Sequence, residues 1–491
     1  MKKSHTGLSS WQLTMMALGT VIGGSFFLGA AVAIHAAGPA ILLNFIVGGA
    51  LVYAILFALS EMTVADPAPG SFRTFAAKAY GSGAGFVVGW IYWTGMVLAM
   101  SSEAIAVSAM VKAWAPALSV PLMGSLIIVA VTCLNLFGAD RLSKLESGLA
   151  AVKLLTIMGF IVLGIAVISG VWIGEEQTPV APVTAQALLP AGLGGLAGSM
   201  LIVMFSYAGF EIIGLAASET AEPAKTVPQA ITYTVFSLIG LYVAAIAVLL
   251  LLVPTAALTV EQSPLVTALM NWNFMWAGNV IAIVLVTAIL STMLAAMFGL
   301  GRMLRSLAEE GHGPAWMQDE GDIPRKGMLV SGGAMLGGLG LGLLLPEQVY
   351  LFLVSSGGFS LLFSYLAILL SHYKLRKSQG CPPAGKCQLP GYPITSLLAI
   401  GGIGFIIITM PLIPGQGAGL AAGLSFVAGF SLIFVVKQRL AARRKIAGND
   451  KASIRDSYGQ ILDMQLEIAD ELTEQTESRG KQVNRKNRKK K

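Results

Sequence analysis

Two clusters of glycine and hydroxyl residues interrupt long apolar stretches of the sequence. The first, Gly19 to Ser25, holds three glycines and two hydroxyl residues within seven positions, and the second, Ser206 to Glu211, combines hydroxyl residues, a glycine and an acid. Glycine has a poor intrinsic helix propensity, so both clusters are weak points in otherwise helical runs. One such cluster usually serves close helix packing. Two clusters in corresponding stretches favour discontinuous helices around a central site.

Breaks of this kind free backbone groups that can bind a zwitterion. Backbone N–H groups at the N-terminus of a half-helix point toward a carboxylate, and the helix dipole adds a favourable potential. Unwound carbonyl groups at the other half-helix accept hydrogen bonds from an ammonium group. An amino acid could therefore be held by its backbone part without a charged side chain of the protein.

Ionisable residues also lie deep within the apolar stretches. Lys153 lies roughly 9 Å from the start of the stretch 147–173, at 1.5 Å per residue. A lysine at that depth is costly in lipid, so it is either a coupling residue or an anchor that reaches back to the cytoplasmic face. Glu103 lies roughly 25 Å along the stretch 85–111, where a partly hydrated acid and a functional acid are equally good interpretations.

The composition identifies the surroundings of these residues. Of the 491 residues, 55% are hydrophobic and 12% are charged, whereas a soluble protein has about a quarter of its residues charged. The chain is therefore predicted to be an all-α integral membrane protein, since about 20 apolar residues cross a bilayer and lipid forbids unpaired backbone. Twelve membrane-spanning helices are expected: 12–35, 39–62, 85–111, 121–138, 147–173, 191–218, 229–253, 276–304, 327–345, 348–373, 394–413 and 418–437.

Basic residues are distributed unevenly between the loops. If the N-terminus lies in the cytoplasm, the inner loops carry nearly all of the loop bases and the outer loops carry only Lys112. This bias predicts a multi-pass protein of the cell membrane with both termini in the cytoplasm. Residues 438–491 form a basic tail, for which contact with anionic lipid is the simplest interpretation and a regulatory partner site is the alternative.

Motifs for other functions are weak or missing. Gly380 to Cys387 approaches a phosphate-binding loop, but Cys387 replaces the Ser or Thr that would bind magnesium. The sequence contains no HExxH metal motif and no GxSxG nucleophile elbow, so it favours no enzyme, cofactor or metal site. The surplus of bases lies in the tail and in short loops, where lipid headgroups are nearer partners than nucleic acid.

Several segments resemble those of amino acid permeases in the amino acid, polyamine and organocation superfamily. The similarity is greatest to the bacterial amino acid transporter group, which includes aromatic, lysine and gamma-aminobutyrate permeases, and it covers about residues 8–440. It rests on four sets of residues: Met16–Gly23 with Ala37–Ala40, Leu59–Ala65 with Pro69–Phe72, Val88–Trp93, and Glu219–Ala230.

The resemblance implies the LeuT-type fold, with two inverted repeats of five helices, helices 1 and 6 discontinuous, and two additional helices. The repeats would comprise residues 12–173 and 191–373, and the additional helices would lie in 394–437. Residues 1–11 would form a cytoplasmic N-terminus before the first repeat.

The resemblance also assigns a substrate site to the two breaks. Gly23, Gly24 and Ser25 would offer N–H groups to the substrate carboxylate, although this sequence departs from the common Gly-Thr-Gly pattern at that position. The ammonium group would donate to carbonyl groups of Thr20 and Val21 in the first break, and to those of Phe205 and Tyr207, near Gly209, in the second. The rings of Phe205 and Phe210 would line or gate the pocket.

Some proton-coupled relatives carry a lysine of the fifth span in place of a sodium ion. Lys153 is the corresponding candidate here, with Ser291 and Thr292 as its polar neighbours, and Glu103 and Glu211 are further candidates. The function implied is proton-driven import of an amino acid by alternating access. Because the sequence assigns no acid to the pocket as a partner for a cationic side chain, a neutral substrate is favoured. An amino acid exchanger and a membrane sensor that signals through the tail are the alternatives.

Overall fold

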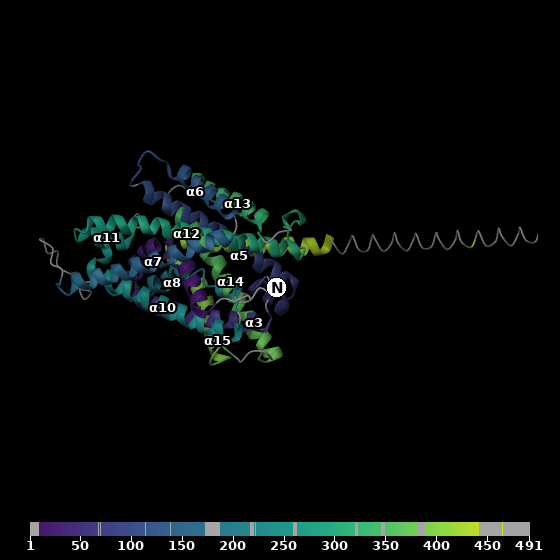
Figure 1. The fold of residues 1–491 in the computed structure, drawn as a ribbon. Helices are drawn as coiled ribbons and strands as arrows, with labels where there is room; N and C mark the ends of the chain where they lie inside the picture. The colour runs from purple at the N-terminus through teal and green to yellow at the C-terminus, as the bar shows by residue number, and fades with distance from the viewer. Residues whose placement is uncertain are drawn as a thin grey trace, which may run out of the picture. The chain divides into compact units, whose positions relative to one another are not determined.

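A computed structural model of the chain describes residues 9–66, 68, 70–112, 114–137, 139–171, 187–216, 220, 222–258, 263–319, 323–344, 349–381, 388–440 and 464. Every regular element in these residues is a helix (Figure 1). The chain divides into two units, Met1–Phe430 and Ser431–Lys491, and the helices α1 to α15 all belong to the first.

The first predicted span is interrupted at the glycine-rich cluster. Helix α1 (Ser10–Val21) begins at a capping box, in which the Ser9 N–H donates to Gln12 Oε1 at 2.9 Å and the Gln12 N–H donates to Ser9 Oγ at 3.3 Å. The helix ends at Val21 because Ile22 is extended, with φ −74° and ψ 97°. The chain resumes as a π-helical turn, η1 (Ser25–Gly29), and continues as α2 (Ala30–Ala37).

The sixth predicted span is interrupted in the same way. Helix α8 (Gly192–Ser206) is followed by turns at residues 207–211 and by the short helix α9 (Ile212–Ala216). Gly209 lies in this break with a φ of +105°, a backbone conformation that residues with a side chain rarely adopt. Glycine at this position therefore permits the chain to turn between the two half-helices.

The other described spans are continuous helices, and each of the twelve predicted spans coincides with helical residues. By length and composition, eight described helices are able to cross a membrane. The number of crossings and the inverted repeat stay predictions. The remaining main helices are α3 (Ile41–Ala65), α4 (Phe72–Tyr80), α5 (Ser82–Lys112), α6 (Val120–Asn135), α7 (Ala139–Ile168), α10 (Pro223–Leu252), α11 (Pro264–Asn271), α12 (Met275–Glu309), α13 (Arg325–Leu344), α14 (Val349–Gln379), α15 (Ile394–Thr409) and a last helix, Gln416–Leu440.

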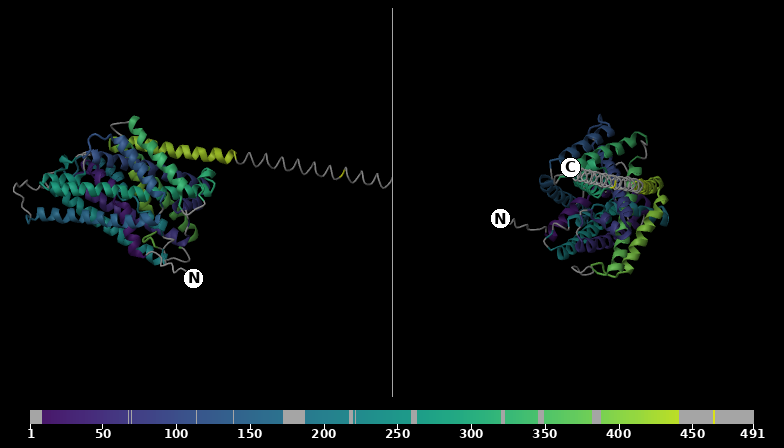
Figure 2. Two further views of the ribbon diagram at one scale, coloured as in Figure 1. Left: turned by 45° about the horizontal axis from the view of Figure 1, so that its top comes forward. Right: turned by 90° about the vertical axis from the view of Figure 1, so that its right-hand side faces the viewer.

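The broken helices lie inside the packing of the first unit. α1 contacts α7, α10 and α12, and α8 contacts α2, α3 and α14, so continuous helices brace each break. α5 packs along α14 and also contacts α12 and α13, while α6 and α13 lie side by side (Figures 1 and 2).

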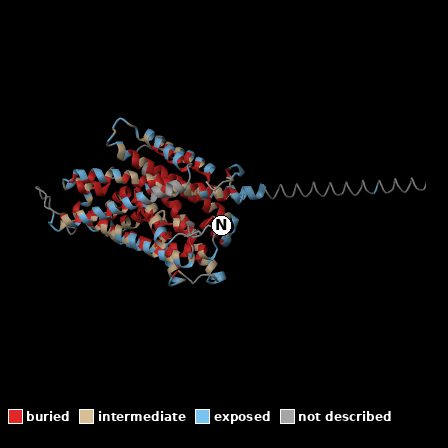
Figure 3. Ribbon diagram, viewed as in Figure 1, coloured by how far each residue is buried: buried red, intermediate tan, exposed pale blue. Residues whose placement is uncertain are grey.

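Buried residues gather where the helices face one another, and exposed residues lie on the outward faces (Figure 3). On α7 the outward face is apolar, since Leu155 and Val162 are 67% and 66% exposed. An apolar outer face with a well-packed interior is what lipid surroundings require.

Candidate functional site

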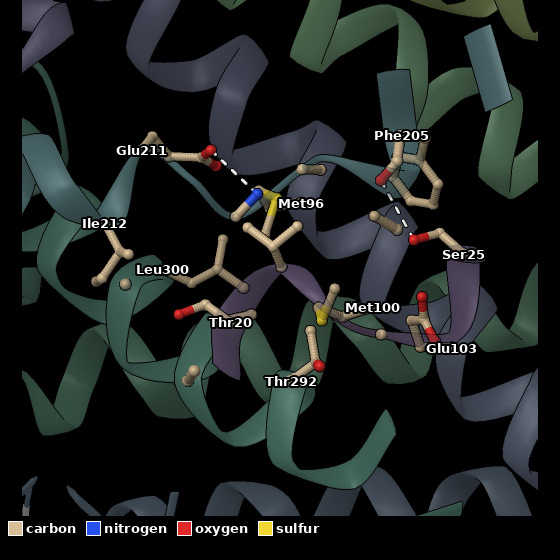
Figure 4. Close-up of a pocket in the computed structure, with 18 of the residues that line it drawn as sticks. Thr20, Ser25, Met96, Met100, Glu103, Phe205, Glu211, Ile212, Thr292 and Leu300 are labelled. Atoms are coloured by element: carbon tan, nitrogen blue, oxygen red, sulfur yellow. Dashed lines mark hydrogen bonds between the residues drawn. The ribbon is translucent and has the colours of Figure 1, made fainter. Parts of the chain in front are cut away.

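A cavity lies where the two breaks meet (Figure 4). Its volume is about 60 Å³, which is room for a few water molecules or a small polar group. The broken first and sixth spans supply one wall, and α5 and α12 supply the other. Its lining is Thr20, Val21, Gly23, Ser25, Tyr92, Met96, Ala99, Met100, Glu103, Phe205, Ala208, Gly209, Glu211, Ile212, Thr292, Ala295, Ala296, Gly299 and Leu300.

The two breaks contact one another directly. The Ser25 hydroxyl donates to the carbonyl oxygen of Phe205 at 3.2 Å, which joins η1 to the end of α8. A Cβ atom added to Gly209 would lie 3.0 Å from the Thr20 carbonyl oxygen, so a side chain there would press on the end of α1. Of the nine residues that the resemblance assigned to the substrate, these four and Val21 and Gly23 line the cavity.

The remaining three of those nine residues are placed differently. Gly24 lies between two lining residues, Gly23 and Ser25. The Tyr207 side chain points to α3, where its hydroxyl donates to the Phe45 carbonyl oxygen at 2.8 Å. Phe210 was expected to line or gate the pocket, but it is fully buried, stacks on Tyr365 with ring centroids 4.8 Å apart, and does not line the cavity.

Lys153 lies beside the first break. Its side chain is buried, and its Nζ donates to the Gly19 carbonyl oxygen at 2.7 Å and to Thr292 Oγ1 at 3.1 Å. The Thr292 hydroxyl also lies 3.4 Å from the Ile22 carbonyl oxygen. The ammonium group of α7 therefore joins the end of α1 to α12, at the junction of the first, fifth and eighth spans. Ser291, the other expected neighbour, is buried and does not line the cavity.

Glu103 projects from α5 against the first break. Its side chain is 5% exposed, and its carboxyl group faces the backbone of Gly24 and Ser25. A Cβ atom on Gly24 would overlap Glu103 Oε2, which shows how closely the carboxyl group approaches the break. Oε2 is buried, and no donor among the described residues makes a hydrogen bond of good geometry to it. Lys153 also interacts electrostatically with this carboxyl group.

Glu211 lies in the second break and lines the same cavity. Oε1 accepts a hydrogen bond from the Tyr92 hydroxyl at 3.0 Å. Oε2 accepts from the Gly209 N–H at 3.1 Å and from the Tyr365 hydroxyl at 3.4 Å. The acids that the sequence named only as further candidates are thus both wall residues of the cavity.

Sequence reasoning missed several functional neighbours of these acids. Tyr92, Met96 and Met100 line the cavity from α5, and Tyr365 reaches Glu211 from α14. Tyr92 belongs to the aromatic segment Val88–Trp93, and it precedes Glu103 by 11 residues, or three helical turns. That spacing places both side chains near one face of α5 and was the available signal.

The sequence matches the family model described as "Amino acid permease" over residues 12–451. The chain belongs to the amino acid permease family. This confirms the resemblance seen in the sequence motifs, and the permease is a membrane transporter rather than an enzyme.

Named relatives of the permease cover most of its length. "Uncharacterized amino acid permease YtnA" of Bacillus subtilis is 33% identical over 84% of this chain and 90% of that protein. "Gamma-aminobutyric acid permease" of Escherichia coli K12 is 33% identical over 84% and 89%. "Aromatic amino acid transport protein AroP" of the same strain is 30% identical over 84% and 90%.

A solved structure shares the fold of the permease. The manganese transporter of Eremococcus coleocola, crystallised with an aromatic bis-isothiourea compound, superimposes with a TM-score of 0.54 over 88% of this chain and 94% of that chain. The two sequences are 13% identical, so the similarity concerns the fold alone.

Proposed function

We propose that the permease imports a neutral amino acid together with a proton, by alternating access across the cell membrane. The observation that carries the proposal is the contact of the buried Lys153 ammonium group with the end of α1 and with α12. A positive charge fixed at this junction takes the place that a bound sodium ion would hold in sodium-coupled transporters of the LeuT-type fold.

The substrate would bind between the two breaks. Its carboxylate would accept hydrogen bonds from N–H groups of Gly23, Gly24 and Ser25, and its ammonium group would donate to carbonyl groups at the ends of α1 and α8. Free N–H groups at a helix start favour an anion, and free carbonyl groups at a helix end favour a cation. The bond between Ser25 and the Phe205 carbonyl oxygen supports this arrangement, because it keeps both ends within one cavity.

Glu103 would share the first break with the substrate carboxylate. Its carboxyl group already faces the backbone of Gly24 and Ser25. A substrate carboxylate bound to the same N–H groups would lie next to the Glu103 carboxyl group. Two adjacent carboxylates do not both stay ionised, because each disfavours the charge of the other. We therefore infer that Glu103 carries a proton, or turns away, while substrate is bound, and that substrate binding and protonation favour one another.

Lys153 would pass the proton that drives transport. In the charged state its hydrogen bonds to Gly19 and Thr292 are strengthened by the positive charge, and they hold α1, α7 and α12 together. Loss of the proton toward the cytoplasm weakens these bonds and releases the half-helix α1. The inward path then opens and the substrate leaves.

Two features support a neutral substrate. Glu211 already accepts from three donors, and Glu103 faces the break rather than the apolar wall of methionines on α5. Neither acid is thus arranged as a free partner for a cationic side chain. The related permeases named above are compatible with a neutral substrate, and their names indicate different substrate side chains.

The test compares wild type with Lys153→Gln in proteoliposomes, using a panel of amino acids with and without pH and sodium gradients. Glutamine keeps an N–H donor but is one atom shorter than lysine and uncharged, so it cannot reproduce the charged hydrogen bond to Gly19. We expect Lys153→Gln to abolish accumulation driven by a pH gradient while counterflow of substrate persists. Lys112→Gln, at the exposed end of α5, is the matched control and should accumulate substrate normally.

Three outcomes would overturn the proposal. They are sodium-dependent uptake by the wild type, pH-driven accumulation by Lys153→Gln, and uptake that occurs only when substrate is present inside the vesicles. The last outcome would identify an obligate exchanger.

A further inference from the structure

A second cavity lies at the ends of α3 and α14, away from the two breaks. Its volume is about 280 Å³, and it shares no lining residue with the cavity of about 60 Å³ described above. Charges of both signs face it, because Glu61, Asp66, Lys78, His372 and Arg376 are among its lining residues. The distribution of basic residues between the loops predicts that this end of the molecule faces the cytoplasm.

Glu61 lies near the end of α3 and is 3% exposed, and its two carboxylate oxygens differ in their contacts. Oε2 accepts hydrogen bonds from the N–H groups of Gln388 at 3.0 Å and Leu389 at 3.3 Å, and from Arg376 Nη1 at 3.1 Å. Oε1 lies 3.4 Å from His372 Nε2, and no described residue donates a hydrogen bond of good geometry to it. This oxygen therefore keeps its capacity to accept.

Arg376, near the end of α14, presents the opposite charge in a similar way. Its Nη1 also donates to the Leu389 carbonyl oxygen at 3.3 Å, and its guanidinium carbon lies 4.3 Å from the centroid of the Tyr392 ring. A guanidinium group has five N–H donors, and those of Nη2 and Nε make no hydrogen bond to a described residue. The pair with Glu61 thus leaves an acceptor on one residue and donors on the other.

His372 is the second observation that points to a ligand. Its side chain is 1% exposed and lines the cavity, yet neither Nδ1 nor Nε2 has a hydrogen-bond partner among the described residues. Buried polar atoms are nearly always paired, because leaving one unpaired costs its full desolvation. A polar molecule bound in the cavity would supply the missing partners.

We propose that this cavity is a second amino acid site, which binds a zwitterion from the cytoplasm. The ammonium group of the ligand donates to Glu61 Oε1, its carboxylate accepts from the N–H groups of Arg376, and His372 completes the polar contacts. Besides His372 the lining carries two acidic and two basic residues, so a simple ion of either sign meets as much repulsion as attraction. The site is independent of the proposed function, because none of its residues lines the substrate cavity.

Histidine NMR measures binding in this cavity without transport. The chain has four histidines, of which His372 lines the cavity, and His372→Phe assigns its resonance. The purified protein, labelled with carbon-13 in the imidazole ring, is titrated in lipid nanodiscs with alanine, propionate or ethylamine. Propionate lacks the ammonium group of alanine, and ethylamine lacks its carboxylate. We expect alanine to shift the His372 resonance saturably and the other two compounds to bind at least about tenfold more weakly.

Two variants test the charged partners of the ligand. Glu61→Gln removes the negative charge, and Arg376→Lys keeps a positive charge but removes the additional donors. Each should raise the dissociation constant of alanine, measured at His372, about tenfold, which corresponds to about 1.4 kcal/mol. Glu309→Gln, at the exposed end of α12, is the matched control and should leave it unchanged. Gly24→Ala, at the first break, should also leave it unchanged.

The site is refuted if alanine causes no saturable shift of the His372 resonance. Equal affinity for propionate would indicate an anion site, and equal affinity for ethylamine a cation site; either result overturns the proposal. A rise in Gly24→Ala as large as in Glu61→Gln would mean that the signal comes from the substrate cavity. Because the resonance reports this cavity alone, a failure of the first break to bind substrate would leave the result intact. Thermal unfolding confirms that each variant is folded, and Arg376→Lys decides the question if Glu61→Gln is not.

Discussion

Gly24→Ala is a sharp test of the first break, since the backbone tolerates the change and the surroundings do not. Gly24 has φ −63° and ψ −27°, which alanine adopts without strain. An added Cβ atom would overlap Glu103 Oε2 and lie 3.0 Å from Glu103 Cδ and 3.1 Å from Ile289 Cδ1. Carbon atoms in contact prefer about 3.5–4.0 Å, so the carboxyl group must retreat by about 1 Å.

The magnitude follows from what that methyl group blocks. It occupies the face of the break where the substrate carboxylate would accept N–H hydrogen bonds. Loss of one hydrogen bond to a charged group costs about 1.5–3 kcal/mol, so we expect the substrate dissociation constant to rise roughly 10- to 150-fold. Equilibrium binding of labelled amino acid to the purified protein measures it, and thermal unfolding shows that the variant is folded.

Gly159→Ala in α7 is the matched control, because nothing lies within 4 Å of the Cβ atom it would add. It should bind substrate like the wild type. A folded Gly24→Ala protein whose dissociation constant stays within about twofold of the wild type would remove the first break from the substrate site.

Two further predictions concern contacts away from the substrate. Thr292→Val keeps the shape of the side chain but removes the oxygen that accepts a hydrogen bond from Lys153 at 3.1 Å. We expect pH-driven uptake to fall severalfold in Thr292→Val and to be retained in Thr292→Ser. Equal uptake by both variants would mean that this contact does not serve coupling. Arg73 is fully buried, and its guanidinium group donates to both carboxylate oxygens of Glu310. Lysine cannot make this bidentate contact, so Arg73→Lys should lower the free energy of unfolding, measured by chemical denaturation, by about 1–3 kcal/mol. An unchanged free energy of unfolding would show that the ion pair contributes little to stability.

The sequence predicted the features that depend on local composition. The apolar stretches located the helices, because a chain in lipid has few other ways to pair its backbone. The glycine clusters located both interruptions, at Ile22 and at residues 207–211. Glycine and hydroxyl residues have a low helix propensity, and this local effect does not depend on the contacts that the helix makes. The depth of Lys153 in its span was also readable from residue spacing.

The features that depend on tertiary packing could not be predicted. α5 is apolar around nearly its whole circumference, so no periodicity showed that Glu103 faces the first break. Phe210 belongs to the break, and from the sequence we expect it in the pocket. In the structure the chain turns at Gly209, which has a positive φ, and the Phe210 ring stacks on Tyr365 of α14. The partners of Glu211 were unknown for the same reason, since their helices are distant in sequence.

The attachment of the Lys153 ammonium group to the polypeptide limits the energetics of the proposed cycle. A bound sodium ion can be lost or replaced by another ion, whereas this cation stays with the chain and only its proton can leave. With a zwitterionic substrate, and with Glu103 keeping its protonation state through the cycle, the proton of Lys153 makes each cycle move one proton and one net charge. One pH unit supplies about 1.4 kcal/mol and 100 mV about 2.3 kcal/mol per charge, so the two together set a ceiling of roughly 500-fold on accumulation. The ceiling is the same for every neutral substrate, however tightly the cavity binds it.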